Sequence, residues 1–153
     1  PGLAMTAARD VVALGADVVR ILFLAGCLLG LLEAGRPETA AVLLVVCVSA
    51  RIAIFLAKAV LRRPRPDFVE PSLASYPTSF PSGHSFMSVV VYLSAALLIP
   101  RSAALVALAA GYAMLLSMAI GVNRMVFGAH WPSDVAAGWL GGLAWVSGAL
   151  LIC

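Results

Sequence analysis

Long hydrophobic runs alternate with short polar stretches along the whole chain. Crossing the hydrocarbon layer of a bilayer takes about 20 helical residues. The runs that approach this length are residues 11–32, 40–61, 82–99, 102–122 and 132–152. Because backbone polar groups cannot stay unpaired in lipid, each run is predicted to be a helix. The pattern predicts an all-α integral membrane bundle of about five transmembrane helices, with residues 1–153 forming one membrane-embedded domain.

The polar connections between these runs differ in length. The longer ones are residues 62–81 and 123–131. Consecutive transmembrane helices alternate in direction, so both longer connections are predicted to emerge at the same membrane face. Residues 1–10 are too short and too polar to span, and are predicted to lie along the interface.

Two glycines lie four residues apart in the last run, Gly138 and Gly142. Small residues at this spacing let helices approach closely. We assign this pattern to packing within the chain in preference to a dimer interface, and the oligomeric state stays open.

The composition fits a protein whose solvent is lipid. Hydrophobic residues make up 63% of the chain, charged residues 11%, and the mean hydropathy is +1.05. A soluble domain of this size has about a quarter of its residues charged. The net charge is only +3, and the basic residues form no continuous stripe, so the expected partner is the bilayer and not a nucleic acid.

The three cysteines, Cys27, Cys47 and Cys153, lie in apolar runs without a metal-binding spacing, and no metal site is predicted.

Three polar motifs lie at the predicted common face: KAVLRRPRP at 58–66, PSGH at 81–84 and NRMVFGAHWPSD at 123–134. A phosphoryl group in transfer spreads negative charge over three oxygens, and fixed cations and backbone N–H groups stabilise it. Lys58, Arg65 and Arg124 supply the cations. Ser82 and Gly83 fall where a helix should begin, and a helix N-terminus binds anions.

The only two histidines of the chain, His84 and His130, both fall inside these motifs. A phosphatase without a metal ion needs a nucleophile and a proton donor for the leaving alkoxide. Imidazole can serve as either near neutral pH. The histidines therefore favour catalysis over simple phosphate binding, which would need the cations alone.

The three motifs, in this order and spacing, resemble the signature of the type 2 phosphatidic acid phosphatase family, which shares a superfamily with vanadium haloperoxidases and bacterial class A acid phosphatases. The resemblance implies a membrane lipid phosphatase that needs no metal or other cofactor. By the same resemblance, His130 attacks phosphorus and becomes phosphohistidine, His84 protonates the leaving oxygen, and Asp134 holds the far nitrogen of His130. Lys58, Arg65, Ser82, Gly83 and Arg124 then bind phosphate.

The family leaves the substrate open among phosphatidate, phosphatidylglycerol phosphate, undecaprenyl diphosphate and lipid A phosphates. It also favours a bacterial inner membrane location with the site facing the periplasm or exterior, whereas a count of Lys and Arg would put this face in the cytoplasm. The loop aromatics Phe68, Tyr76 and Phe80 are predicted to form a rim over the site.

This chain departs from the family pattern in two places. Asn123 replaces a serine before Arg124. Family members commonly have six helices, so either a first helix has been trimmed or this is a short natural form. Two rival functions stay open, a vanadate-dependent haloperoxidase and a non-catalytic binder or transporter of phosphorylated lipids.

The remaining charges have simpler interpretations. Arginines near helix ends usually anchor a protein at the membrane interface, and this role is predicted for Arg36, Arg62, Arg63 and Arg101. Arg51 instead lies deep in a hydrophobic run, where an isolated charge costs about 2.5–3.5 kcal/mol. Since Asp17 falls at a similar depth in the preceding run, an Arg51–Asp17 ion pair is predicted.

Overall fold

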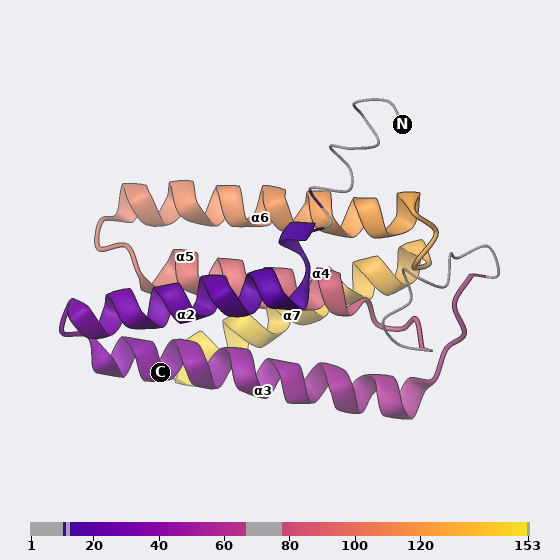
Figure 1. Cartoon of the computed structure of the whole chain (residues 1–153), viewed down its shortest axis with the longest axis horizontal. Coiled ribbons are helices and arrows are strands. Elements are labelled where there is room, and N and C mark those ends of the chain that lie inside the picture. The colour runs from indigo at the N-terminus through magenta and orange to yellow at the C-terminus, as the bar shows by residue number, and fades with distance from the viewer. Residues whose placement is uncertain (1–10, 12, 67–77, 153) are drawn as a thin grey trace.

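The computed structural model describes residues 11, 13–66 and 78–152. The described part is helical throughout its regular structure (Figure 1). Its elements are α2 (Asp17–Glu33), α3 (Pro37–Leu61), α4 (Gly83–Ser88), the π-helix η2 (Val89–Leu93), α5 (Ser94–Leu98), α6 (Ala103–Val126) and α7 (Pro132–Ile152). Because α4, η2 and α5 follow one another without a break, they form one rod over residues 83–98. The predicted all-α bundle of five helices is confirmed.

The predicted helix boundaries shift where local chemistry decides them. The first long helix begins at Asp17, after a turn and a bend at Gly15 and Ala16, and not at residue 11. The second begins three residues before its predicted start, because Pro37 suits the first turn of a helix. The predicted interfacial segment, residues 1–10, lies outside the described residues.

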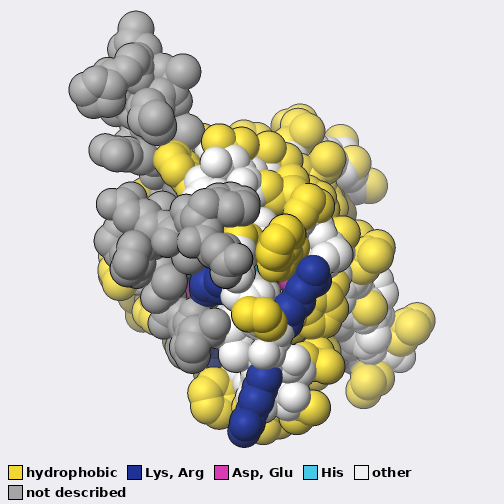
Figure 2. Space-filling model, turned by 90° about the vertical axis from the view of Figure 1, so that its right-hand side faces the viewer, with side chains coloured by type: hydrophobic (Ala, Val, Ile, Leu, Met, Phe, Trp, Pro, Cys, Tyr) yellow, Lys and Arg dark blue, Asp and Glu magenta, His cyan; other side chains and the backbone are white. Residues whose placement is uncertain are grey.

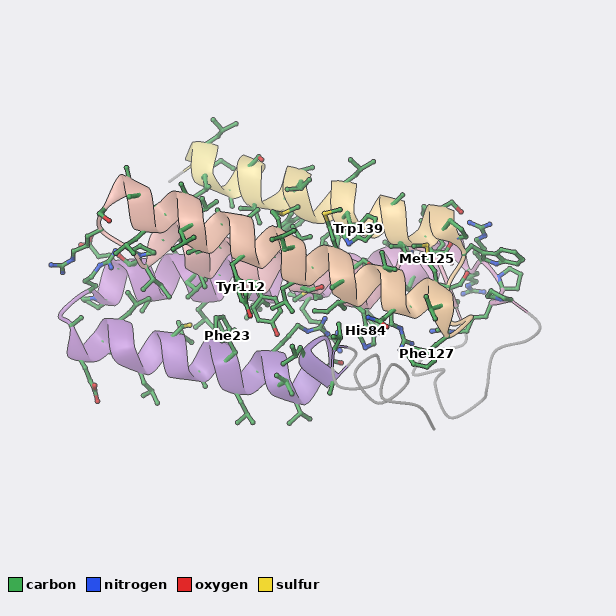
Figure 3. All side chains as sticks on the ribbon, turned by 90° about the horizontal axis from the view of Figure 1, so that it is seen from above. Phe23, His84, Tyr112, Met125, Phe127 and Trp139 are labelled. Atoms are coloured by element: carbon green, nitrogen blue, oxygen red, sulfur yellow. The ribbon has the colours of Figure 1, made fainter. Side chains whose placement is uncertain are left out.

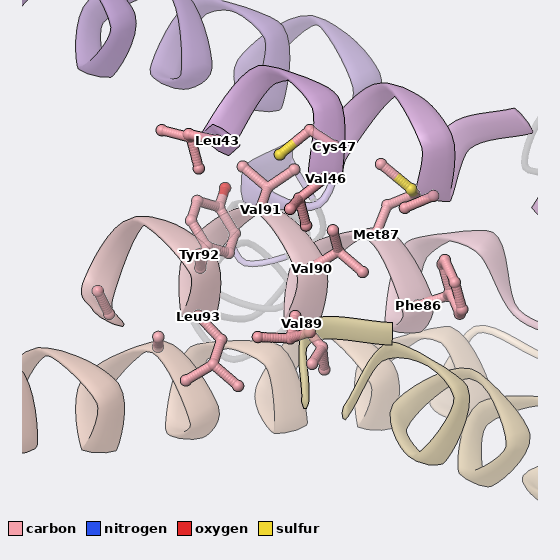
Figure 4. Close-up of a cluster of buried hydrophobic side chains, with 14 of the residues drawn as sticks. Leu43, Val46, Cys47, Phe86, Met87, Val89, Val90, Val91, Tyr92 and Leu93 are labelled. Atoms are coloured by element: carbon pink, nitrogen blue, oxygen red, sulfur yellow. The ribbon is translucent and has the colours of Figure 1, made fainter. Parts of the chain in front are cut away.

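The rod over residues 83–98 is the centre of the bundle. Its residues are almost all buried, and Val89 and Val90 have no exposed surface. In Figure 4, Val90 and Val91 face Val46 and Cys47 of α3, while Leu93 points to the opposite side of the rod. This helix is therefore surrounded by the others and supplies much of the core.

The outer helices show the reverse pattern. Large hydrophobic side chains are exposed along α2, α3, α6 and α7, including Val60 at 78%, Leu108 at 71% and Leu140 at 67%. Each of α3, α6 and α7 is long and apolar enough to cross a membrane. The rod is shorter, at 16 residues, but it is apolar and enclosed. A surface of this kind is stable in lipid and not in water.

Close backbone approach joins α7 to the rod. A Cβ atom at Gly138 would lie 2.8 Å from the Ser82 carbonyl oxygen, and one at Gly142 would lie 2.8 Å from Val89 Cβ. Neither position has room for a side chain. The assignment of these glycines to packing within the chain is confirmed.

The helix directions bring four helix ends to one end of the bundle. α3 and α6 end there, while α4 and α7 begin there, at the right-hand side of Figure 1. All three polar motifs belong to these four helix ends. Viewed onto this end, Lys and Arg side chains emerge among hydrophobic ones (Figure 2).

Candidate active site

The turn between α6 and α7 sets the position of His130. Gly128 has a φ of 66°, and its N–H donates to the Met125 carbonyl at 2.9 Å. The Ala129 N–H donates to the Arg124 carbonyl at 3.0 Å, which completes the paired hydrogen bonds of a Schellman motif. The His130 N–H donates to the same Arg124 carbonyl at 3.2 Å. The spacing from Arg124 to His130 is thus fixed by the way α6 ends.

The start of α7 positions Asp134. Pro132 begins the helix, and the Asp134 carboxylate oxygen Oδ2 reaches back to accept the Trp131 N–H at 2.9 Å. This is the reciprocal half of a capping box, in which a side chain in the first helical turn satisfies the N–H before the helix. The carboxylate is completely buried.

The start of the rod is tied to the same place. The Ser82 N–H donates to the Asp134 carbonyl at 2.9 Å, and the Ser82 hydroxyl accepts from the Ser85 N–H at 3.4 Å. Ser82 is therefore a helix cap, as its sequence position predicts. Gly83 and His84 follow it at the first turn of the helix.

A cavity of about 350 Å³ lies where these helix ends meet. Its lining includes Lys58, Ala59, Arg62 and Arg65 of the first motif, Gly83 and His84 of the second, and Arg124 and His130 of the third. Lys58 Nζ donates to the Thr78 carbonyl at 3.2 Å, and Arg65 donates to the Ala129 carbonyl at 2.6 Å. Residues from three separate parts of the sequence thus enclose one electropositive space. In Figure 3, His84 lies between α2 and α6, near the end where Phe127 closes α6.

His130 is held in its neutral form by this environment. Its residue exposure is only 4%, and burial lowers the pKa of the imidazole from 6.5 to about 2, helped by the positive charges of Arg65, Lys58 and Arg124. A neutral imidazole keeps a lone pair, which a nucleophile requires. Protonation would instead add another positive charge to a cavity wall that already carries Lys58, Arg65 and Arg124.

The predicted contact between His130 and Asp134 is close. His130 Nδ1 lies 3.5 Å from Asp134 Oδ2, which is longer than an ordinary hydrogen bond, and the two groups are neighbours without a hydrogen bond between them. With Nδ1 on the side of Asp134, Nε2 is the nitrogen left to react.

Arg63 has a role that the sequence interpretation missed. Its guanidinium donates to Asp134 Oδ1 at 2.9 Å and to Ser133 Oγ at 2.7 Å, and lies over the Trp131 ring with 5.6 Å to the ring centroid. The prediction that Arg63 only anchors the chain at the interface is therefore wrong. A signal was its position inside the first motif, two residues before Arg65. Arg36 is also more than an anchor, since it donates to the carbonyls of Leu98 and Ile99 at the end of α5.

The predicted site residues thus fall into two groups, those that line the cavity and those buried behind it. Six line the cavity, whereas Ser82 and Asp134 have no exposed surface and support it from behind. Asn123 turns away, because its side-chain amide donates to the Ala119 carbonyl at 2.9 Å. Of the predicted rim aromatics, Phe80 is partly buried, while Phe68 and Tyr76 lie outside the described residues.

The predicted Arg51–Asp17 ion pair is confirmed, with 2.9 Å between Arg51 Nη2 and Asp17 Oδ2. Asp17 also pairs with Arg20, and all three residues line the cavity that holds the histidines. No feature of the sequence indicates that this pair shares the site. Among the described residues, no cluster of three His, Cys, Asp or Glu side chains could hold a metal ion.

Comparison with known proteins agrees with the motifs and the fold. The PAP2 superfamily model matches residues 39–152. The structure is similar to a transmembrane PAP2 type phosphatidylglycerolphosphate phosphatase from Bacillus subtilis, with a TM-score of 0.89 and 22% identity over 99% of this chain and 78% of that one. It is also similar to LpxE of Aquifex aeolicus, with a TM-score of 0.72 and 22% identity over 99% of this chain and 87% of that one. Curated protein sequences give no significant match.

Proposed function

The chain belongs to the PAP2 superfamily, and from this premise we propose that it is an integral membrane phosphatase that hydrolyses a phosphate ester or diphosphate of a membrane lipid. The observation that carries the proposal is the convergence of both histidines with Lys58, Arg65 and Arg124 on one cavity at the end of an apolar bundle. The lipid tail stays in the bilayer while its phosphate enters the cavity. The Bacillus subtilis protein of similar structure is a phosphatidylglycerolphosphate phosphatase.

In the proposed mechanism, Lys58, Arg65 and Arg124 bind the phosphate oxygens. His130 Nε2 attacks phosphorus, a nitrogen–phosphorus bond forms, and the bond from phosphorus to the leaving oxygen breaks. His84 gives that oxygen its proton, and the lipid alcohol or lipid phosphate leaves.

Water then attacks the phosphohistidine. His84 takes a proton from the water, the nitrogen–phosphorus bond breaks, and inorganic phosphate is released. Asp134 stabilises the positive charge that develops on the His130 ring during the first step. Since protein side chains carry every step, no metal ion is needed.

Phosphate release from lipid phosphates tests the proposal. The purified chain in detergent, with EDTA present, is expected to release phosphate, and His130→Ala is expected to lose at least about a thousandfold in kcat, as removal of a nucleophile does elsewhere. Arg101→Gln, at the opposite end of the bundle, is the matched surface control. Acid quenching with ³²P-labelled lipid should trap a label on the parent chain and none on His130→Ala.

Each outcome separates the candidate functions. Equal phosphate release by the parent chain and His130→Ala would overturn the assigned nucleophile. Phosphate binding without any release would favour a non-catalytic binder of phosphorylated lipids.

A further inference from the structure

One charged residue of α2 is buried although much of the helix surface is exposed. The large hydrophobic side chains of Val18, Ile21 and Leu22 are all exposed. The residues that this helix buries are Leu31 and Arg20, and Arg20 is only 4% exposed. Burying a charged side chain in a membrane bundle is costly, and such residues usually serve a functional site. The burial of Arg20 therefore needs an explanation beyond the packing of α2.

Arg20 reaches the first turn of the rod, at His84. Its Nη1 donates to the His84 carbonyl oxygen at 3.4 Å, and its Nη2 donates to the Asp17 carboxylate. The Ser88 hydroxyl donates to the same carbonyl. A helix carbonyl normally accepts from one backbone N–H, whereas this one also attracts two side chains, one of them from another helix. The proposed proton donor is thus held through its backbone by a helix that carries none of the three motifs.

The backbone of His84 decides where its ring can lie. Among the described residues, the side-chain hydrogen bonds to His84 end at its carbonyl oxygen and not at its imidazole. The His130 ring, by contrast, lies beside Asp134. A general acid must come within about 2.6–3.2 Å of the atom that takes its proton. A shift of the first turn of the rod would therefore move the His84 imidazole out of reach of the leaving oxygen.

Arg20 is itself fixed from two sides. Asp17 accepts from Arg20 and also from Arg51 of α3, with 2.9 Å between Arg51 Nη2 and Asp17 Oδ2. The Tyr92 hydroxyl of the rod donates to the Leu14 carbonyl at 2.5 Å, just before α2 begins. These contacts join the start of α2 to both α3 and the rod. The guanidinium of Arg20 therefore has a defined position relative to the first turn of the rod.

We propose that Arg20 is a positioning residue for the proton transfer, holding the backbone of His84 so that its imidazole meets the leaving oxygen. Asp17 in turn holds the guanidinium of Arg20. The proton moves from the His84 ring to the leaving oxygen as the bond from phosphorus to that oxygen breaks, and Arg20 exchanges no proton. This inference rests on the proposed phosphatase function, to which it adds a residue of α2.

The test uses two phosphate esters that differ in their need for a proton. Dodecyl phosphate releases an alkoxide, which has to be protonated, whereas a nitrophenyl phosphate with the same dodecyl tail releases a stable phenolate. Arg20→Gln should lower kcat/KM for the alkyl ester at least about tenfold, a part of the effect of a general acid, with little change for the nitrophenyl ester. His84→Ala should show the same selectivity, at least about a hundredfold. A purely structural role of Arg20 would lower kcat/KM for both esters alike.

Three further variants bracket this result. Arg20→Lys keeps the charge, but its single nitrogen replaces the forked guanidinium that serves Asp17 and His84 separately. Its ratio of the two kcat/KM values should fall between those of the parent chain and Arg20→Gln. Asp17→Asn should lower the ratio in the same sense, because it removes the ion pair that holds the guanidinium. Arg101→Gln, at the opposite end of the bundle, should leave the ratio as it is.

The outcomes distinguish this inference from the function beneath it. Equal losses on both esters in Arg20→Gln, or no loss on either, would overturn the role of Arg20 and leave the phosphatase intact. Equal losses on both esters in His84→Ala would overturn His84 as proton donor and this inference with it. Hydrolysis of neither ester by the parent chain would overturn the proposed function as well. If Arg20→Gln does not fold, Arg20→Lys carries the test, and an unchanged ratio in that variant would overturn the inference.

Discussion

At the scale of single residues, the protonation state of His130 is set by burial and by the positively charged side chains around it. Burial and the nearby cations together lower the pKa of His130 to about 2. The imidazole should therefore remain neutral from pH 8 to pH 4. Nitrogen NMR of histidine-labelled protein, assigned with His130→Asn, measures this directly. Titration of His130 near pH 6.5 would contradict the described environment.

The same pKa shift has a consequence for stability. Below pH 6.5 the unfolded chain takes up a proton at His130 that the folded chain does not. His130 therefore lowers the free energy of unfolding as the pH falls, by at most about 1.4 kcal/mol per pH unit. His130→Asn should have a shallower decrease of melting temperature between pH 6.5 and 4.5 than the parent chain.

Arg63 acts through Asp134 and not through the cavity. Its loss would leave the buried carboxylate with the Trp131 N–H and the nearby His130 as partners. We expect Arg63→Gln to lower kcat about tenfold, the typical cost of a lost hydrogen bond to a charged group, with little change in KM. Arg63→Lys should recover part of kcat because a lysine keeps the charge. An unchanged kcat in Arg63→Gln, matched to Arg101→Gln, would show that this ion pair does not support His130.

At the scale of helices, α7 depends on small residues to lie against the start of the rod. Gly138→Ala places a methyl group 2.8 Å from the Ser82 carbonyl and from Ser85 Cβ. The helices must then separate, and we expect a loss of about 1–3 kcal/mol in stability. We also expect reduced activity, because Ser82 begins the helix that is proposed to bind phosphate. The measurements are thermal unfolding in detergent and phosphate release.

Gly148→Ala provides the control on the same helix. A Cβ at Gly148 meets nothing within 4 Å, and alanine favours the helix over glycine by up to about 1 kcal/mol. This variant should be as stable as the parent chain or more so. Equal destabilisation by both substitutions would mean that helix approach at Gly138 is unimportant.

The helices were predictable because lipid leaves each hydrophobic run only one regular structure. Their boundaries shifted where a proline or a turn decided them, as at Pro37 and Gly15. The enclosed position of the rod was not predicted. A usable signal was its buried serines, Ser85, Ser88 and Ser94, since small polar residues gather where transmembrane helices pack against one another.

The candidate site could likewise be predicted only in part from the sequence. The residues that carry charge or a lone pair could be recognised, because phosphate chemistry demands them at the helix ends. The supporting contacts could not, because Arg63 meets Asp134 only through the way α3 ends beside α7. Similarly, the sequence predicted the Arg51–Asp17 pair from equal depth, but depth along a helix does not say which cavity a side chain faces.

At the scale of the whole molecule, the bundle has two chemically different ends. The motif end holds Lys58, Arg65, Arg124 and His130, and the other end holds the short connections near Arg36 and Arg101. An apolar surface separates the two ends. The chain therefore has to be oriented across the membrane, and all its proposed chemistry takes place at one side.

We propose that the motif end faces the periplasm or exterior of a bacterial inner membrane. Many of the basic residues at this end line the cavity. Their proposed role is to bind phosphate, so they do not report orientation as ordinary loop charges do. Single cysteines in place of Arg62 and Arg101, in a chain whose three native cysteines are replaced by alanine, mark the two ends. A maleimide that does not cross membranes should label Arg62→Cys in cells with a permeabilised outer membrane, and Arg101→Cys only after lysis. The reverse result would place the cavity in the cytoplasm, and labelling of both positions in unlysed cells would contradict the membrane-spanning bundle itself.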